Sequence, residues 1–274
     1  MRFVRLAAIC VFFASVAAGC ALLPPAVPEP FVPPPSVEGL PSVVPSVPSE
    51  SWTEVAPGVE RWEGVLPGTE ARLLLYRFEA GRFAWHAAAG PFRSMAEWAN
   101  ALPEAVFVAN GGYFHEDGTP SGYLRAGGER VGERAFDPDR SAFLLFGDAP
   151  SMQEIGIEEA GALGQDVVQS YPVLIRAGQP AVTSDSGLAA RRTLFGTDGE
   201  GNAYVGIMPD RSATLYQLSE GLAHLPIEWA DVLNMDGGSS TGAVLRPSAP
   251  GASLETIPSF LPVPNVFYAV PLAP

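Results

Sequence analysis

The sequence is divided into short apolar runs, separated by turns rich in Gly, Pro and Asp. Short runs rich in Val, Leu, Phe and Tyr predict β-strands, because a helix of a globular protein needs a longer amphipathic pattern. Strands are predicted at Arg72–Glu79, Phe83–Ala89, Ala105–Ala109, Ser141–Gly147, Pro172–Ala177, Thr193–Thr197, Ala203–Met208, Asp231–Met235, Ala243–Arg246 and Val266–Val270. The segment Asp198–Asn202 has the composition of a hairpin turn between two of these strands. A chain with this pattern must bury its core mainly between sheets.

Helical patterning is limited to three segments. Ser94–Ala101 and Ala213–Leu225 have the spacing of amphipathic helices, and a third helix is expected around Glu158–Val168. Strands outnumber helices and do not alternate with them regularly, as a doubly wound parallel sheet would require. We therefore expect an α+β fold: mixed, largely antiparallel sheets with a few packed helices, in a single globular domain over Ser51–Pro274.

The first twenty residues have the features of a secretory signal. Arg2 and Arg5 precede the apolar run Leu6–Val16, which is followed by small residues and Cys20. A run of this length is too short for a membrane span, which needs about 20 apolar residues. The segment ending at Cys20 resembles the lipobox of bacterial lipoproteins, which implies lipidation of Cys20 and, in a Gram-negative host, an outer-membrane location facing the periplasm. An ordinary signal peptide over residues 1–20 is the alternative.

Residues 21–50 are crowded with proline, which favours extended polyproline II backbone. They predict a semi-rigid linker, and a disordered tail is the alternative. Cys10 and Cys20 are the two cysteines of the chain, so the exported domain is predicted to have no internal disulfide. Acidic residues outnumber basic ones, 30 to 16, which disfavours nucleic acid and anionic membrane surfaces as partners. Membrane contact is expected through the lipid on Cys20 only.

Two of the predicted strands end in asparagine followed by paired glycines. The segments are Asn110-Gly111-Gly112-Tyr113-Phe114 and Asn234-Met235-Asp236-Gly237-Gly238-Ser239. A strand end of this kind directs polar side chains outward from a rigid element, and glycine lets backbone N–H groups approach a ligand closely. We expect the two strand ends to form one polar pocket.

Two further segments have polar groups beside a predicted strand. They are Ser170-Tyr171-Pro172-Val173-Leu174 and Arg191-Arg192-Thr193-Leu194-Phe195-Gly196. The planar guanidinium group offers paired donors that suit carboxylate or phosphate oxygens. In so acidic a chain, the alternative for the two arginines is a surface salt bridge.

Taken together and in this order, the four segments resemble the phosphodiester glycosidase family, over roughly residues 70–272. Two positions depart from the family pattern: Arg191 stands where proline is frequent, and Ser239 stands where a third glycine is usual. The resemblance implies hydrolysis of a sugar-1-phosphate diester at the glycosidic bond, with a glycosyl phosphate or glycan as substrate. It implies no cofactor and no metal.

The resemblance assigns the catalytic residues to Asp236, Arg192 and Asn110. Asp236 is expected to act as the base for water or as the nucleophile at C1, and Arg192 to stabilise the charge on the leaving phosphate. Asn110 and Asn234 would position sugar hydroxyls or phosphate oxygens. The remaining substrate-binding positions are expected to be Gly111, Gly112, Gly237, Gly238, Ser239, Thr193, Arg191 and Ser170.

Other readings of the same residues are open. A non-catalytic module that binds phosphorylated glycans would use the same arginine and asparagines. A phosphodiesterase that cuts the P–O bond would normally need a metal cluster, and no His, Asp and Glu residues have zinc-site spacing. The candidates for a second catalytic carboxylate are Glu116, Asp117, Asp185 and Asp198, and the sequence does not rank them.

Overall fold

The computed structural model describes residues 51–132, 142–154, 156, 159–160, 165–247 and 253–273. The predicted signal peptide (residues 1–20), the lipidation site Cys20 and the predicted linker (residues 21–50) lie outside the described residues. Residues 45–274 form one compact unit. Every strand pair recorded among the described residues is antiparallel.

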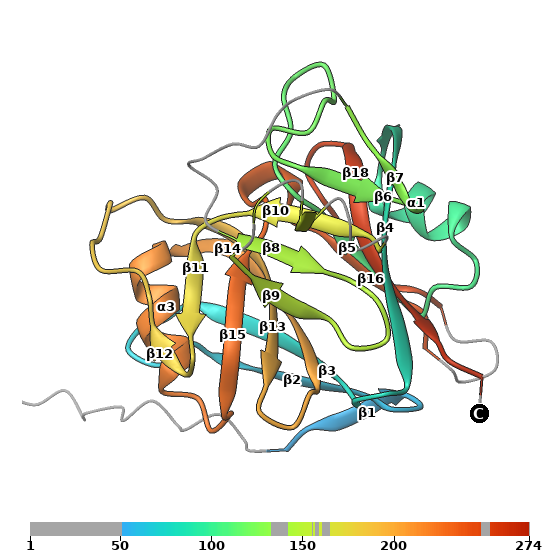
Figure 1. The fold of residues 1–274 in the computed structure, drawn as a ribbon. Coiled ribbons are helices and arrows are strands. Elements are labelled where there is room, and N and C mark those ends of the chain that lie inside the picture. Colours follow the sequence, from blue (N-terminus) through green and yellow to red (C-terminus); the bar gives the residue numbers. More distant parts are fainter. Residues whose placement is uncertain are drawn as a thin grey trace, which may run out of the picture. The chain divides into compact units, whose positions relative to one another are not determined.

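The largest sheet has eight strands and contains two of the four segments of interest and the end of a third, Val173 and Leu174 (Figure 1). In sheet order the strands are β1 (Thr53–Ala56), β2 (Val59–Val65), β3 (Arg72–Phe78), β14 (Ala203–Ala213), β13 (Ala190–Asp198), β15 (Trp229–Asn234), β11 (Val173–Arg176) and β12 (Gln179–Pro180). β13 begins with the arginine pair, and β15 ends with Asn234. β13 and β15 are neighbours near the middle of the strand order, so both segments lie in the central part of this sheet.

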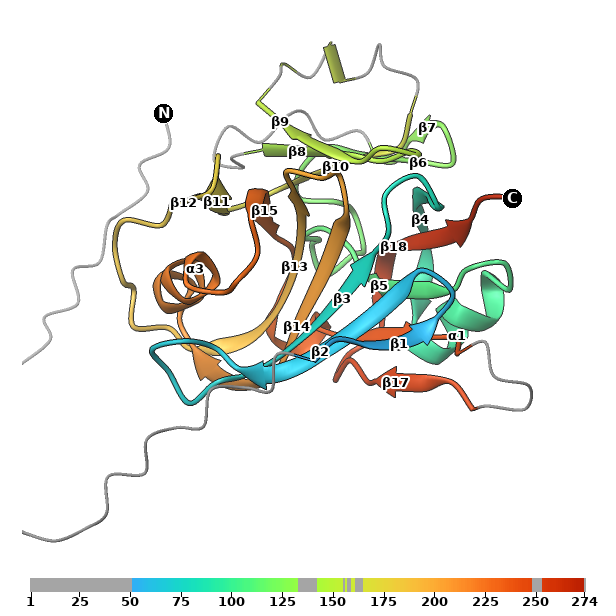
Figure 2. The ribbon, with the colours of Figure 1, turned by 90° about the horizontal axis from the view of Figure 1, so that it is seen from below.

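The second sheet contains the other strand that ends in asparagine. Its order is β17 (Glu255–Ile257), β16 (Ala243–Leu245), β5 (Phe107–Asn110), β18 (Val263–Pro271) and β4 (Phe83–Arg93). A third sheet consists of β7 (Glu129–Arg130), β6 (Leu124–Ala126), β10 (Val167–Ser170), β8 (Ala142–Leu145) and β9 (Ser151–Gln153), which Figure 2 shows as a layer of its own. β6 contacts β4 and β9 contacts β15, so the third sheet packs on both of the others.

An aromatic cluster fills the space between the sheets. Trp85 of β4 and Phe267 of β18 lie against Phe195 of β13, with ring centroids 4.9 Å and 5.6 Å from it. Phe146, next to β8, stacks on Phe267 at 5.9 Å. Burial of several large rings is the main source of stability for a domain of this kind. It also fixes β13 relative to β18, and therefore relative to the neighbouring β5.

The described part of the chain contains two α-helices, α1 (Met95–Ala101) and α3 (Leu215–Ala223). Both begin at a capping box, in which the side chains of Ser94 and Thr214 accept hydrogen bonds from the backbone three residues later. α1 lies beside β5 and β16, and α3 beside β11 and β12 (Figure 1). With so few helices the fold is predominantly β, so the predicted α+β class is corrected, whereas the largely antiparallel sheets are confirmed.

All ten predicted strands are present, within a few residues of the predicted bounds, and so are the hairpin turn at Asp198–Asn202 and the two helices that begin near Ser94 and Thr214. The helix expected around Glu158–Val168 is wrong at its end, because Val167 and Val168 belong to β10. The rest of that segment lies mostly outside the described residues. Among those residues, no helix is both long and apolar enough to cross a membrane.

Candidate active site

The side chain of Asn110 connects three segments that are far apart in the sequence. Its Oδ1 accepts hydrogen bonds from Thr193 Oγ1 at 2.6 Å and from the Gly242 backbone N–H at 3.1 Å. Its Nδ2 donates to the Asp236 carbonyl oxygen at 2.8 Å. Asn110 is 1% exposed. The end of β5 is thus fixed to β13 and to the chain that follows β15.

Asp236 is held by its backbone on the other side as well. Its N–H donates to the Gly111 carbonyl oxygen at 3.1 Å, and its Oδ1 accepts from the Gly237 N–H at 2.8 Å. Asp236 is half-buried, whereas Asn110 and Thr193 are buried. The carboxylate is therefore placed by several contacts and still reaches the surface, as a group that acts on a bound molecule must.

Replacement of Asn110 by alanine should lower the free energy of unfolding by about 3 kcal/mol, because three buried hydrogen bonds are lost and the Gly242 N–H is left without its partner. Urea unfolding of both proteins measures the difference. Asn100, at an exposed position of α1, is a matched control whose replacement by alanine should change stability by less than about 0.5 kcal/mol. Equal stability of wild type and Asn110→Ala would contradict this role.

Asn234 holds two tyrosines together. Its Nδ2 donates to the Tyr113 hydroxyl at 2.7 Å and to the Tyr171 carbonyl oxygen at 3.0 Å. The two tyrosine rings are 5.1 Å apart, and Ser170 Oγ donates to the Asn234 carbonyl oxygen at 2.7 Å. Asn234 Oδ1 is buried and has no hydrogen-bond partner among the described residues. Asn234 and Ser170 thus join the strand ends of β15 and β10.

Arg192 lies next to Gly237, the residue after Asp236, and is 9% exposed. A β-carbon placed on Gly237 would be 3.9 Å from Arg192 Nη1. Arg192 Nη2 donates to the Leu188 carbonyl oxygen at 2.9 Å, while Nε has no hydrogen-bond partner among the described residues. Burial lowers the pKa of Arg192 from its ordinary value, and the nearby Tyr113 hydroxyl partly offsets this. A buried cation with an unused donor is poised to bind an anion.

Arg191 is also buried, and two of its three nitrogens donate hydrogen bonds within the protein, whereas Nη1 has no hydrogen-bond partner among the described residues. Nε donates to the Pro209 carbonyl oxygen at 2.7 Å, and Nη2 donates to the Pro258 carbonyl oxygen at 2.9 Å. The guanidinium carbon lies 4.1 Å from the centre of the Phe260 ring. Burial lowers the pKa of Arg191 as well. Arg191 therefore ties β14 to the loop before β18.

The family profile of the phosphodiester glycosidases matches residues 103–270, which is more than half of the chain. The chain belongs to the phosphodiester glycosidase family. The match includes all four segments from which the site is built.

Two solved structures are similar to this member of the phosphodiester glycosidase family. The first is a hypothetical protein from Synechocystis, with a TM-score of 0.58 and 13% identity over 79% of this chain and 62% of that one. The second is the catalytic domain of zebrafish N-acetylglucosamine-1-phosphodiester alpha-N-acetylglucosaminidase, with a TM-score of 0.53 and 17% identity over 80% of each chain. At these identities the likeness concerns the fold. None of the curated proteins compared with the chain matches it.

The motif glycines of this family member make room chiefly for the protein's own atoms. A β-carbon on Gly111 would lie 2.1 Å from Asn265 Oδ1, and one on Gly112 would lie 2.8 Å from Val168 Cγ1. One on Gly237 would lie 2.9 Å from the Arg191 carbonyl oxygen. Gly238, by contrast, has a φ of +64° and open space around it, and the following Ser239 is exposed. Gly238 and Ser239 are thus the positions of this segment that a ligand can approach.

Sequence reasoning missed Asn265 as a site residue. Asn265 lies on β18, is 3% exposed, and donates from Nδ2 to the Gly112 carbonyl oxygen at 3.3 Å. Its Oδ1 has no hydrogen-bond partner among the described residues. A lone asparagine in the apolar segment Val263–Pro271 was the signal available. Tyr113 and Tyr171 lay within the motif segments but had no assigned role.

The four candidates for a second carboxylate have other surroundings. Asp117, Asp185 and Asp198 each accept backbone N–H groups of their own turn, and Asp198 is at the opposite end of β13 from Arg192. Glu116 is exposed in the loop after Gly112. Among the described residues, no three or more His, Cys, Asp or Glu side chains are grouped to hold a metal ion.

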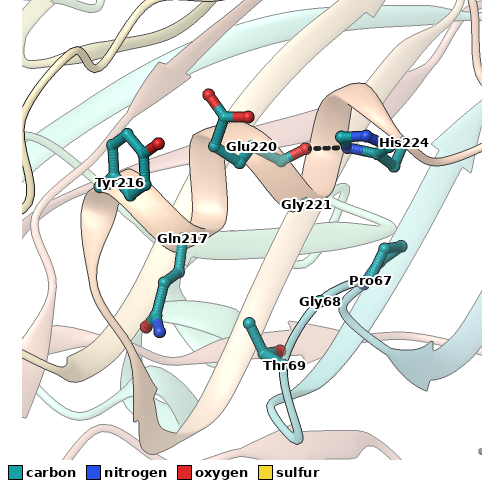
Figure 3. A pocket seen from close by; sticks show the side chains of 8 residues that line it. All are labelled: Pro67, Gly68, Thr69, Tyr216, Gln217, Glu220, Gly221 and His224. Carbon is teal, nitrogen blue, oxygen red and sulfur yellow. Dashed lines mark hydrogen bonds between the residues drawn. The ribbon is translucent and has the colours of Figure 1, made fainter.

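A cleft of about 280 Å³ lies elsewhere, between α3 and the loop at Pro67–Thr69 (Figure 3). On the helix side it is lined by Glu220 and His224, whose Nδ1 lies 2.7 Å from the Glu220 carbonyl oxygen. None of its lining residues comes from the four motif segments. The candidate active site of this family member is therefore identified by its polar groups and not by cavity size.

Proposed function

We propose that the protein hydrolyses the glycosidic bond of sugar-1-phosphate diesters. The observation that supports this best is that Gly237, the residue after the half-buried Asp236, lies against Arg192, a buried guanidinium group with an unused Nε. Hydrolysis of such a diester requires a carboxylate that activates water and a positive charge that stabilises the anionic leaving group. Membership of the phosphodiester glycosidase family agrees with this chemistry.

In the proposed reaction, water attacks C1 of the sugar while the bond between C1 and the phosphate oxygen breaks. Asp236 takes the proton from the water, or attacks C1 itself before water releases the sugar. The bonding electrons leave with the phosphomonoester, and Arg192 stabilises the charge that develops on it. A buried cation does this more effectively than a solvated one, because it needs no reorganisation during the reaction.

The other polar residues have positioning roles in this proposal. Asn110 fixes the backbone of Asp236 through its carbonyl oxygen, and Thr193 keeps the Asn110 amide in the orientation that makes this possible. Asn234 orients Tyr113, which lies near Arg192. Gly238 and Ser239 lie where the sugar or phosphate can approach the chain.

We further propose that the enzyme is exported and held at the bacterial envelope by a lipid on Cys20, with residues 21–50 as a linker. Its substrates would then be glycoconjugates of the envelope or of the surrounding medium. The basis is the sequence of the first fifty residues: a basic start, a short apolar run, a cysteine after small residues and a proline-rich segment.

Turnover of sugar-1-phosphate diesters in ¹⁸O-labelled water tests the proposed reaction. Glycosidic cleavage puts the label on the sugar C1 hydroxyl and leaves the phosphomonoester unlabelled. The sugar is sampled early, with unlabelled free sugar in the same water as the control for anomeric exchange. Label in the phosphate would make the protein a phosphodiesterase. Tight binding without turnover across a broad panel of diesters would make it a binding module for phosphorylated glycans.

A further inference from the structure

Exposed apolar side chains are concentrated next to the candidate active site. The described residues include five large apolar side chains that are clearly exposed: Val65, Phe92, Leu188, Phe260 and Leu261. The last three are 71%, 70% and 57% exposed, and the backbone of each is hydrogen-bonded to a residue of the site. We call Leu188, Phe260 and Leu261 the apolar rim.

Contacts with the site fix each member of the apolar rim. Leu188 accepts the hydrogen bond from Arg192 Nη2 through its carbonyl oxygen. Phe260 and Leu261 donate their backbone N–H groups to the Ser239 carbonyl oxygen, at 2.8 Å and 3.2 Å. One face of the Phe260 ring covers the Arg191 guanidinium group. The backbone of each rim residue is therefore held against the segments that carry the site.

The apolar rim has no structural reason to remain in water. Moving an apolar side chain out of water stabilises a protein, so several exposed ones at one place mark a surface that binds something. Here that surface adjoins Arg192, a buried cation with an unused donor. A ligand that suits both has an anionic group with an apolar chain attached.

We propose that the apolar rim binds an apolar alcohol portion of the substrate, so that the preferred substrates are glycosyl phosphodiesters of long-chain alcohols or lipids. This rests on the proposed function. A phosphodiester has two ester bonds, one to the sugar and one to the second alcohol. Arg192 contacts Leu188 on one side and adjoins Gly237, next to Asp236, on the other. With the sugar at Asp236 and the phosphate at Arg192, the second alcohol lies at the apolar rim.

The charge of the chain favours a substrate tail over a membrane surface as the occupant. Acidic residues outnumber basic ones by 30 to 16, which repels anionic lipid headgroups. Surfaces that dock on membranes usually combine apolar residues with lysine and arginine at the exposed edge. The two arginines at this site are buried instead.

The test compares the methyl and octyl phosphodiesters of one sugar 1-phosphate, with the octyl ester below its micelle concentration. Each methylene that leaves water contributes about fourfold, so even partial burial should raise kcat/KM of the octyl ester at least about tenfold over the methyl ester. Leu188→Ser and Leu261→Ser should each reduce this ratio severalfold. Val65→Ser, at an exposed position of β2, is the matched control and should leave it unchanged.

Equal kcat/KM for the two esters would overturn the inference and leave the proposed function intact, whereas no turnover of either ester would overturn both. A high ratio that survives both rim substitutions would place the tail elsewhere and also overturn the inference. Weaker binding of Leu261→Ser to phosphatidylcholine vesicles, with an unchanged ester ratio, would make the apolar rim a membrane contact and overturn it as well.

Discussion

Replacing Asp236 with asparagine should reduce kcat on a sugar-1-phosphate diester by about 10³-fold or more. The amide can neither accept the proton of the attacking water nor attack C1. It can still accept the hydrogen bond that Asp236 Oδ1 receives from the Gly237 N–H, and the backbone contacts with Asn110 and Gly111 do not involve the side chain. We therefore expect the folded structure to be unchanged. Steady-state kinetics and a thermal melt of the same preparation measure both effects.

The control is Asp148→Asn, which removes one carboxylate at an exposed position after β8 and should leave kcat unchanged. Retention of more than about a tenth of wild-type kcat by Asp236→Asn would show that another group activates the water. Binding of substrate by the inactive variant is also informative, because Arg192 is intact. A similar dissociation constant for a non-hydrolysed phosphonate analogue would assign Asp236 to catalysis and not to binding.

Replacing Arg192 with methionine should lower kcat/KM by about 10²- to 10³-fold, the usual effect of removing one group that stabilises transition-state charge. Stability should be kept or even increased. Among the described residues, Arg192 makes one hydrogen bond, to Leu188, and its Nε is unpaired. The desolvation energy that it costs to bury this charge is therefore offset only slightly by contacts in the folded state. Kinetics and a thermal melt measure the two effects, and a Tm within about 3 °C of wild type is expected.

Arg191→Met provides the contrast. Its guanidinium group bonds the carbonyl oxygens of Pro209 and Pro258 and stacks on Phe260, so its loss should lower Tm by about 4–8 °C. Its effect on kcat/KM should be much smaller than that of Arg192→Met. If Arg192→Met were the less stable variant and Arg191→Met the less active one, the roles of the two arginines would be exchanged.

The strands could be predicted wherever the chain has an apolar run long enough to be buried on both faces. β5 and β8 are examples, because all of their residues are buried. β7 and β17 could not be predicted, because they are two or three residues long, carry polar side chains and lie at sheet edges. Such strands exist only through pairing with a neighbour.

Apart from the hairpin that joins β13 and β14, the arrangement of the strands could not be predicted. β13 pairs with β15, and β5 with β18, although many residues separate the partners. Pairing of this kind depends on side-chain packing between sheets, such as Phe195 against Phe267. The local sequence of a strand does not show which other strand it will pair with.

For the site, the sequence predicted which segments come together but not how each residue is used. Asn110, Thr193 and Asp236 do meet, through hydrogen bonds to the Asn110 side chain. In the sequence, the two adjacent arginines look equivalent, yet in the structure their side chains have different hydrogen-bond partners. Paired glycines likewise suggest an approach to a ligand, whereas Gly111 makes room for Asn265, a residue from the other end of the domain. Only tertiary packing distinguishes these cases.

The position of β18 between β5 and β4 determines when this domain can complete its folding. Residues Val263–Pro271 follow every other described strand in the chain, yet they fill the gap between two strands that come far earlier. Until they are inserted, β4 and β5 each have an unpaired edge, and Asn110, the last residue of β5, lacks its partner across the sheet, Val266. The unfolded chain must therefore be kept from aggregating until the last strand is available, and the candidate site around Asn110 is complete only when that strand has been inserted.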